Sequence, residues 1–551
     1  TWDGSDRPLV YMHPERRGQP ALAPGDRVLA KLRRMGAGRY EGRTIKRLAA
    51  EDRSRILGVL EGGRLRPVDK RARADWAIPR GEEHGAAEGD LVLAQPLPTH
   101  GTGLGLRPAR VMEVLGRMGG PRSVSLLCVH AHGIPDDFPD AAVAQAERAR
   151  GVGPEGREDL RHLPLVTIDG ADARDFDDAV FAEADNGGWR IVVAIADVAH
   201  YVRPGSALDR EARRRGVSVY FPDRVVPMLP EALSNNWCSL RPGEDRGCLF
   251  AEMHFDNAGR KLRHRFGRGL MRSAARLTYE AAQDSHDADP AHLADLYGAF
   301  RALATARDAR GTLELELPER RVELDDNGRV LSIRPRARLD SHRLIEEFMI
   351  AANVSAAEEL ERLRRPCVYR VHDRPSDAKL EALRRFLDGL DLSLPPGDHL
   401  RPRDFAALLD AARDRPEERL VHETVLRAQS QAEYSPDNIG HFGLALPRYA
   451  HFTSPIRRYA DLLVHRSLIE GMGLGPDGLT AGEAEQLPDT CGHVTTTERR
   501  AATAERDAVE RYLAAHMADR VGAQFPARIS GVTRFGLFVT LDENGASGIV
   551  P

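Results

Sequence analysis

The segment 166–183, VTIDGADARDFDDAVFAE, restricts the fold of this chain more than any other feature of the sequence. Within ten residues it holds five aspartates: Asp169, Asp172, Asp175, Asp177 and Asp178. The apolar stretches on either side are typical of buried strands, so we expect the carboxylates on a bend between two strands. Two carboxylates about 4 Å apart repel by about 4 kcal/mol at an effective dielectric of about 20, which is a large part of the stability of a domain. The fold therefore needs positive charge among them.

Two sources can supply this positive charge. Arg174 provides one charge within the segment, and a divalent cation such as Mg²⁺, with Mn²⁺ as a substitute, prefers carboxylate oxygens and keeps several waters. A calcium loop that starts at Asp169 or Asp175 is disfavoured, because alanine stands at a ligand position and the sixth-position glycine is missing. Aspartates that hold Mg²⁺ are suited to phosphodiester hydrolysis. The cluster thus predicts a nucleic-acid substrate; the alternative is an ordinary solvated acidic turn.

A second segment, YAHFTSPIRRYADLLVHR, predicts a loop that leads into a helix, with Ser454 as its cap and Pro455 at the first helical position. Arg457 and Arg458 are then expected in the first helical turn, where free backbone amides and the helix dipole favour an anion. The alternative is that Arg457 pairs with Asp461, four residues further on, as ordinary helix support.

Composition excludes several classes of protein. The formal net charge of −4 gives no overall attraction to nucleic acid. The five cysteines never form C-x-x-C, which argues against a disulfide framework or a zinc site and fits a reducing cytoplasm. No apolar run approaches the roughly 18 residues of a membrane span, and no Walker sequence indicates a nucleotide cofactor.

The pattern of apolar residues changes along the chain. Residues 1 to about 155 show short apolar bursts between Gly, Pro and Asp, which predicts small β-barrels. From about 156 to 520, strand-like segments mix with long helical ones, which indicates an α+β body. The last residues, 521–551, alternate apolar and small side chains, with Phe535 and Phe538 placed to stack on bases as in an RNA-binding OB strand pair. This segment stops before a barrel could close, and the chain starts without Met, so we expect both ends to be incomplete.

Four segments of the α+β body resemble the ribonuclease II/ribonuclease R (RNB) family: DGADARDFDDAV, RGVSVYFPDRVVPMLPEALSNNWCSL, IEEFMIAANVSAAEE and YSPDNIGHFGLALPRYAHFTSPIRRYADLLVHR. The resemblance implies an α+β catalytic RNB domain flanked by OB-fold barrels. The expected domains are 1–53, a partial cold-shock barrel; 54–155, a second cold-shock barrel and linker; 156–520, the catalytic domain; and 521–551, the start of an S1 barrel. The implied activity is processive, Mg²⁺-dependent 3′-to-5′ hydrolysis of RNA to nucleoside 5′-monophosphates by a monomer.

The resemblance also assigns roles to individual residues. The metal ligands it implies are Asp169, Asp175, Asp177 and Asp178, whereas Asp172 matches no ligand. The catalytic residues it implies are Asp175, Asp177 and Arg457. The residues expected to bind RNA, some of them on less distinctive flanking sequence, are Tyr220, Tyr279, Glu347, Arg457, Arg458, Glu505, Phe535 and Phe538.

Three rival hypotheses remain open. A catalytically silent RNA-binding regulator with the same fold is disfavoured because all four metal aspartates are present. A DNA exonuclease differs only in contacts to the 2′-hydroxyl, which no linear motif displays. An enzyme of the ribonuclease II type, restricted to single-stranded RNA, carries the same motifs.

Overall fold

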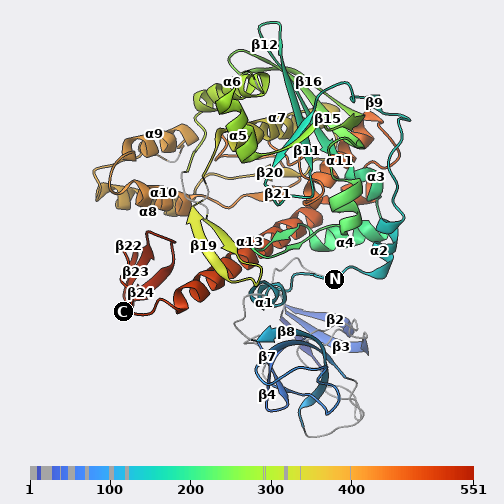
Figure 1. The fold of residues 1–551 in the computed structure, drawn as a ribbon, viewed down its shortest axis with the longest axis vertical. Helices are drawn as coiled ribbons and strands as arrows, with labels where there is room; N and C mark the ends of the chain where they lie inside the picture. Colours follow the sequence, from blue (N-terminus) through green and yellow to red (C-terminus); the bar gives the residue numbers. More distant parts are fainter. Residues whose placement is uncertain are drawn as a thin grey trace. The chain divides into compact units, whose positions relative to one another are not determined.

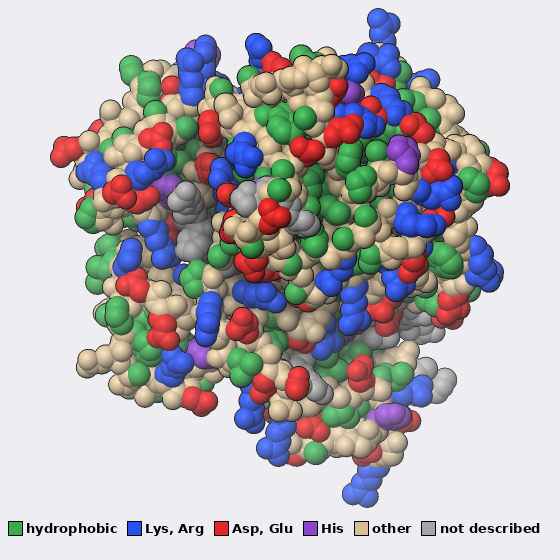
Figure 2. Space-filling model, turned by 45° about the horizontal axis from the view of Figure 1, so that its top comes forward, with side chains coloured by type: hydrophobic (Ala, Val, Ile, Leu, Met, Phe, Trp, Pro, Cys, Tyr) green, Lys and Arg blue, Asp and Glu red, His purple; other side chains and the backbone are tan. Residues whose placement is uncertain are grey.

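The computed structural model describes residues 9–13, 28–36, 39–47, 56–68, 74–97, 105–117, 123–289, 291, 293–315, 320–335, 337–397 and 399–551. The chain forms two compact units, Thr1–Leu127 and Cys128–Pro551. Figure 1 shows the ribbon of both units. In the view of Figure 2, basic and acidic side chains are interspersed over the surface, in keeping with the small net charge.

The first unit contains a closed barrel, as the short apolar bursts predict. Its strands, in the order β4-β5-β6-β8-β7 around the barrel, are β4 (Ile56–Glu61), β5 (Arg64–Pro67), β6 (Trp76–Ala77), β7 (Asp90–Pro96) and β8 (Arg107–Arg117). Apolar side chains such as Leu65 and Val92 fill its interior. Before it lies a three-stranded sheet of β1 (Leu9–Met12), β3 (Arg39–Arg47) and β2 (Val28–Gly36). The rest of the barrel expected over 1–53 lies outside the described residues.

The second unit is built on a seven-stranded sheet in the order β17-β10-β11-β12-β15-β16-β9. These strands are β9 (Glu158–Asp159), β10 (Val166–Asp169), β11 (Asp178–Asp185), β12 (Gly188–Ala196), β15 (Asp245–Asp256), β16 (Lys261–Arg272) and β17 (Ala275–Thr278). The run IVVAIA of β12 is entirely buried, as expected for a central strand covered on both faces. Helix α7 (Asp340–Leu363) packs against β12 and β15, and α11 (Tyr459–Met472) packs against α7.

The remaining elements are helices and shorter strands, many of which are labelled in Figure 1. The helices are α1 (Ser123–Ala131), α2 (Asp140–Glu147), α3 (Val198–Tyr201), α4 (Ala207–Arg215), the π-helix η1 (Leu233–Trp237), α5 (Tyr279–Ala288), α6 (Ala294–Arg310), α8 (Asp377–Asp388), α9 (Pro402–Ala412), α10 (Glu418–Ala428), α12 (Ala481–Glu485) and α13 (Leu487–Ala518). The short strands are β13 (Val219–Tyr220), β14 (Val225–Val226), β18 (Arg320–Leu324), β19 (Val330–Pro335), β20 (Tyr369–Val371) and β21 (Glu433–Ser435). A three-stranded sheet follows, of β22 (Ala527–Thr533), β23 (Gly536–Leu541) and β24 (Ser547–Val550). The mixture confirms the predicted α+β body.

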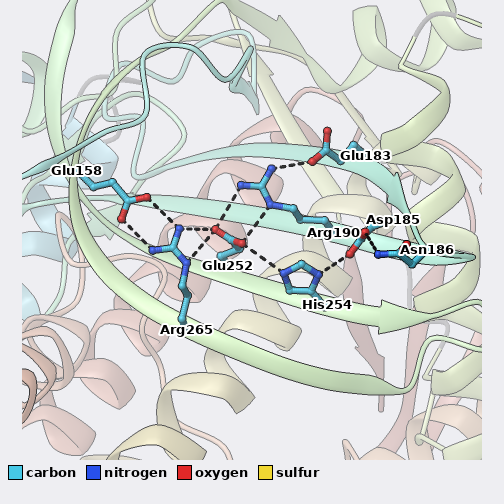
Figure 3. Close-up of polar contacts among 8 residues, drawn as sticks. All are labelled: Glu158, Glu183, Asp185, Asn186, Arg190, Glu252, His254 and Arg265. Carbon is cyan, nitrogen blue, oxygen red and sulfur yellow. Dashed lines mark hydrogen bonds and ion pairs between the residues drawn. The ribbon is translucent and has the colours of Figure 1, made fainter.

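A network of charged side chains crosses the central sheet (Figure 3). It consists of Glu158, Glu183, Asp185, Asn186, Arg190, Glu252, His254 and Arg265. Arg190 lies 2.7 Å from Glu183 and 3.2 Å from Glu252. Arg265 lies 2.6 Å from Glu252 and 2.8 Å from Glu158. Each arginine therefore pairs with two acids, and Glu252 is shared by both arginines.

Candidate active site

One cavity of about 620 Å³ brings together side chains from four distant parts of the chain. Most of them come from the bend between β10 and β11, the β13–β14 hairpin, helix α7 and the segment that precedes α11, and Tyr279 at the start of α5 adds a further part. The cavity is lined by nine of the residues that the sequence singles out: Asp169, Asp172, Asp175, Asp177, Asp178, Tyr220, Tyr279, Arg457 and Arg458. The prediction that the aspartates lie on a bend between two strands is confirmed, because β10 ends at Asp169 and β11 begins at Asp178.

Asp177 is the most enclosed of the five aspartates, with only 4% of its surface exposed. Its Oδ1 accepts a 2.8 Å hydrogen bond from the backbone N–H of Ile456. Its Oδ2 is buried, has no hydrogen-bond partner among the described residues and lies 3.6 Å from Nε of Arg457. Such an orphaned carboxylate oxygen is costly in an interior, and a cation is the natural partner for it.

Burial also shifts the titration of the neighbouring carboxyl groups. It raises the pKa of Asp177 well above the usual value, against the opposing charge of Arg457. It raises the pKa of Asp178 to about 7, with a further contribution from the charge of Asp169, and it raises the pKa of Asp169 itself. Burial in this bend therefore disfavours the charged forms of these carboxyl groups.

The donor set fits a hard divalent cation. Carboxylate oxygens are the ligands that Mg²⁺ prefers. The carboxylates of Asp169, Asp175, Asp177 and Asp178 line one cavity, and one of their oxygens, Oδ2 of Asp177, has no hydrogen-bond partner among the described residues. Over the described ranges, no three His, Cys, Asp or Glu side chains are gathered closely enough to hold a metal ion by themselves.

The predicted start of the second helix was wrong. Helix α11 begins at Tyr459 rather than at Pro455, and Arg458 is its extended N-cap residue (φ −135°, ψ 123°). The reason is a pairing with a distant segment, because Val217 forms a β-bridge with Arg458 and the Tyr459 N–H donates to Gly216 O. Both arginines therefore lie before the first helical turn.

The two arginines have different partners. Arg458 donates to both oxygens of Asp461, at 2.8 and 2.7 Å, and Asp461 is completely buried. The alternative that Arg457 pairs with Asp461 is therefore wrong, because the neighbouring Arg458 makes this pair. Arg457 is half exposed and faces Asp177, while its Nη2 donates to Ser454 Oγ at 3.0 Å. Only Arg457 of the pair presents a largely uncommitted charge to the cavity.

Two tyrosines occupy the rim of the cavity. Tyr220, 39% exposed, donates its O–H to Asp175 Oδ2 at 3.2 Å. Its backbone N–H donates to Glu505 of α13 at 2.7 Å; Glu505 therefore holds the hairpin and is not a lining residue of the described cavity. Tyr279 stacks on His342 with ring centroids 4.0 Å apart.

The expected role of Glu347 is not supported by its position. Its carboxylate is buried and lies 2.5 Å from Nη1 of Arg307, whereas the preceding residue, Glu346, lines the cavity. The lining residues of α7 are Ile345, Glu346, Met349, Ile350 and Asn353. This spacing is one face of a helix with 3.6 residues per turn, and Glu347 falls outside it.

Phe538 lies on β23 of the C-terminal sheet and Phe535 in the turn before this strand, and neither lines the described cavity. They are 66% and 43% exposed, so their rings are accessible as predicted. The ring of Phe535 also carries the guanidinium of Arg534, 4.5 Å from its centroid.

Three residues that make contacts at the site were not identified from the sequence. Asn353 of α7 donates to Tyr449 Oη at 3.0 Å and accepts from the Phe452 N–H at 2.7 Å, so it holds the segment before α11. Arg276 of β17 donates to the carbonyl oxygen of Ala171 at 2.7 Å. Ser239 bonds the backbone of the aspartate bend. For the contacts of Asn353, the sequence offered one signal, a single asparagine among the apolar residues of α7.

Comparison with known proteins places this cavity in a class of nucleases. Residues 157–472, more than half of the chain, match the RNB domain family, and residues 65–139 match the cold shock domain family. Ribonuclease R of Escherichia coli is 41% identical over 558 residues, a match that covers 96% of this chain and 68% of that protein. The chain therefore belongs to the ribonuclease R family of RNB-domain 3′-to-5′ exoribonucleases.

Solved structures agree with this assignment. Mycoplasma genitalium RNase R without ligand superimposes with a TM-score of 0.82 at 27% identity, covering 95% of this chain and 86% of that one. The same protein has been solved with ribose-methylated single-stranded RNA and with double-stranded RNA. Yeast Ssd1, described as a pseudonuclease, shares the fold with a TM-score of 0.67 at 20% identity, over 93% of this chain and 66% of its own. The fold by itself therefore does not establish catalysis, which has to be inferred from the side chains of the cavity.

Proposed function

We propose that this chain degrades RNA processively from the 3′ end to nucleoside 5′-monophosphates, with Mg²⁺ held by the aspartate bend. The observation that carries the proposal is the buried, unpartnered Oδ2 of Asp177 beside the half-exposed Arg457, in a cavity of about 620 Å³.

The metal ligands we propose are Asp169, Asp175, Asp177 and Asp178. A Mg²⁺ ion is commonly bound by one or two carboxylates, with water and phosphate oxygens as its other ligands. When bound, the ion supplies an activated water and stabilises the leaving oxygen of the phosphodiester. The charge of the ion also favours the ionised carboxylates, whose pKa values are raised mainly by burial in this bend.

The chain's own residues divide the remaining work. Arg457 places a guanidinium next to Asp177, where it stabilises negative charge on a phosphate that enters the cavity. The partly exposed ring of Tyr220 offers a stacking surface for a base at the rim, worth about 1–3 kcal/mol. Arg458, paired with Asp461, acts on RNA less directly than we expected from the sequence.

We further propose single-stranded and structured RNA as substrates, since the solved relative from Mycoplasma is complexed with both kinds. The expected division into barrels at 1–53, 54–155 and 521–551 around a catalytic domain at 156–520 is part of this proposal. None of the helices in the described part of the chain has the length and apolar character needed to cross a membrane. All five cysteines are unpaired and buried, which fits our placement of the enzyme, as a monomer, in the cytoplasm.

The test uses a 5′-labelled RNA and a DNA of the same sequence, each incubated with Mg²⁺ or with excess EDTA. We expect RNA to shorten from its 3′ end without ATP, EDTA to stop the reaction, and DNA to persist. Undiminished cleavage in EDTA would exclude the metal role. RNA binding without any cleavage in Mg²⁺ would favour the alternative of a catalytically silent RNA-binding regulator. Ssd1, which shares the fold, is described as a pseudonuclease.

A further inference from the structure

Ser239 holds the aspartate bend from behind. It follows the π-helix η1 and is completely buried. Its Oγ donates to the carbonyl oxygen of Arg174 at 2.8 Å and accepts the N–H of Phe176 at 3.0 Å. A serine hydroxyl has one hydrogen to donate, and here the donor and an acceptor position are both used on the two neighbours of Asp175.

The backbone around these contacts is anchored in the same way. The N–H of Leu240 donates to Phe176 O at 3.0 Å, and the N–H of Ala196 donates to Asp177 O at 2.8 Å. Residues 174, 176 and 177 are therefore each held through a backbone atom. The bend cannot rotate about this stretch without breaking several hydrogen bonds at once.

The directions of the two carboxylates follow from this anchoring. Asp175 meets the Tyr220 O–H at 3.2 Å, and Asp177 meets the Ile456 N–H at 2.8 Å. Ser239 itself is not among the described residues that line the cavity, so it touches neither substrate nor a carboxylate. Its influence has to pass through the backbone of Arg174 and Phe176.

We infer that Ser239 is a positioning residue for RNA cleavage, whose hydroxyl fixes the direction of Asp175 and Asp177 in the cavity. The inference rests on the proposed function of those aspartates. It also gives a role to the end of the LPEALSNNWCSL stretch, which the resemblance marks but to which the proposed chemistry assigns nothing.

The test compares Ser239→Ala with Ser239→Thr. The alanine removes both hydrogen bonds, and a misplacement of catalytic groups by about 1 Å costs about 10²-fold in rate, so we expect single-turnover cleavage at saturating RNA to fall by about 10- to 100-fold. The affinity for RNA, measured by filter binding, should change little, because Ser239 itself does not line the cavity. Threonine retains the hydroxyl and should restore most of the rate.

The matched control is Ser467→Ala. Ser467 is also buried, and its hydroxyl donates to Pro366 O; neither residue is among those that line the described cavity. We expect it to lower thermal stability about as much as Ser239→Ala and to leave cleavage unchanged. Equal loss of rate in both alanine variants would mean that general destabilisation is responsible, and would overturn the inference.

Two further variants make the outcome decisive. If Ser239→Ala does not fold, Ser239→Cys replaces it, because a thiol keeps a similar size but is a weak donor and acceptor; a normal rate in Ser239→Cys would refute the positioning role. Asp177→Asn is measured alongside. Normal cleavage by Asp177→Asn contradicts the proposed function itself, whereas an inactive Asp177→Asn beside a fully active Ser239→Ala contradicts only the role of Ser239.

Discussion

The backbone N–H of Ile456 donates a 2.8 Å hydrogen bond to Oδ1 of Asp177, although the two residues lie 279 positions apart in the chain. This contact orients the carboxylate so that its other oxygen is left without a hydrogen-bond partner, 3.6 Å from Arg457. The segment before α11 therefore both aims Asp177 and supplies the nearest cation. Binding geometry and charge compensation come from one short stretch of chain.

The first prediction concerns Asp177→Asn. Asparagine keeps an oxygen for the Ile456 N–H and nearly the same volume, so the variant should fold. It removes one negative charge at the metal-binding bend, and cleavage should fall by at least about 10²-fold, the scale of one preorganised electrostatic contribution. RNA affinity should hold or rise, since repulsion of phosphate decreases. Single-turnover cleavage beside filter binding measures both.

The matched control for this prediction is Asp172→Asn, the same substitution in the same bend. The Asp172 side chain is 82% exposed and lies 3.8 Å from Arg321, a surface pair worth about 0–1 kcal/mol at most. We expect normal cleavage. Equal loss in the two variants would show that total charge matters and that Asp177 has no special position.

The second prediction separates Arg457 from Arg458. Arg457→Ala should slow cleavage by about 10- to 10³-fold with little loss of stability, because it removes a half-exposed stabilising charge. Arg458→Ala should instead destabilise the fold by about 3–5 kcal/mol, since it leaves the buried Asp461 without its partner. Urea unfolding and single-turnover rates of the two variants test the contrast; a stable Arg458→Ala protein would contradict it.

The third prediction concerns where degradation stops. Tyr220→Ala removes a stacking surface worth about 1–3 kcal/mol, so the final product should become longer while long RNA is still bound. Tyr220→Phe keeps the ring and loses only the hydrogen bond to Asp175, and it should give the product length of the unmodified chain. Gel analysis of the limit products decides; identical products from all three proteins would remove Tyr220 from the site.

The fourth prediction concerns acid stability through the network of Figure 3. Burial by itself raises the pKa of Glu252, but hydrogen bonds from Arg190 and Arg265 outweigh it and lower the pKa to about 2. A carboxyl group whose pKa is lower in the folded state stabilises that state above its unfolded pKa, and the benefit is lost as pH falls from about 4.5 to about 2. Because Arg265 is half exposed, we expect the group to contribute no more than about 2 kcal/mol.

Glu252→Gln isolates this contribution from the other carboxyl groups that titrate in the same range. The variant should be less stable than the unmodified chain at pH 7, and the two unfolding free energies should converge as pH falls to about 2. Chemical denaturation between pH 2 and pH 7 provides the measurement. A constant difference over the whole range would show that lost packing, rather than charge, explains the effect.

Local sequence patterns determined much of what this protein is. The alternation of apolar and turn residues predicted the barrel of β4–β8, the mixture of strand-like and long helical segments predicted the α+β body, and the run of aspartates predicted a charged bend between two strands. Each of these depends on residues that are neighbours along the chain, where periodicity and like-charge repulsion can be read directly.

Only the tertiary structure decided which of these side chains work together. The pairing of Val217 with Arg458 moved the start of α11 to Tyr459. The rotation of α7 brought Glu346 to the cavity and turned Glu347 towards Arg307. The support of the aspartate bend by Ser239 joins segments 63 and 65 positions apart. These outcomes depend on hydrogen bonds and packing between remote segments, whose free energy is realised only when the chain closes on itself, and no local pattern records them.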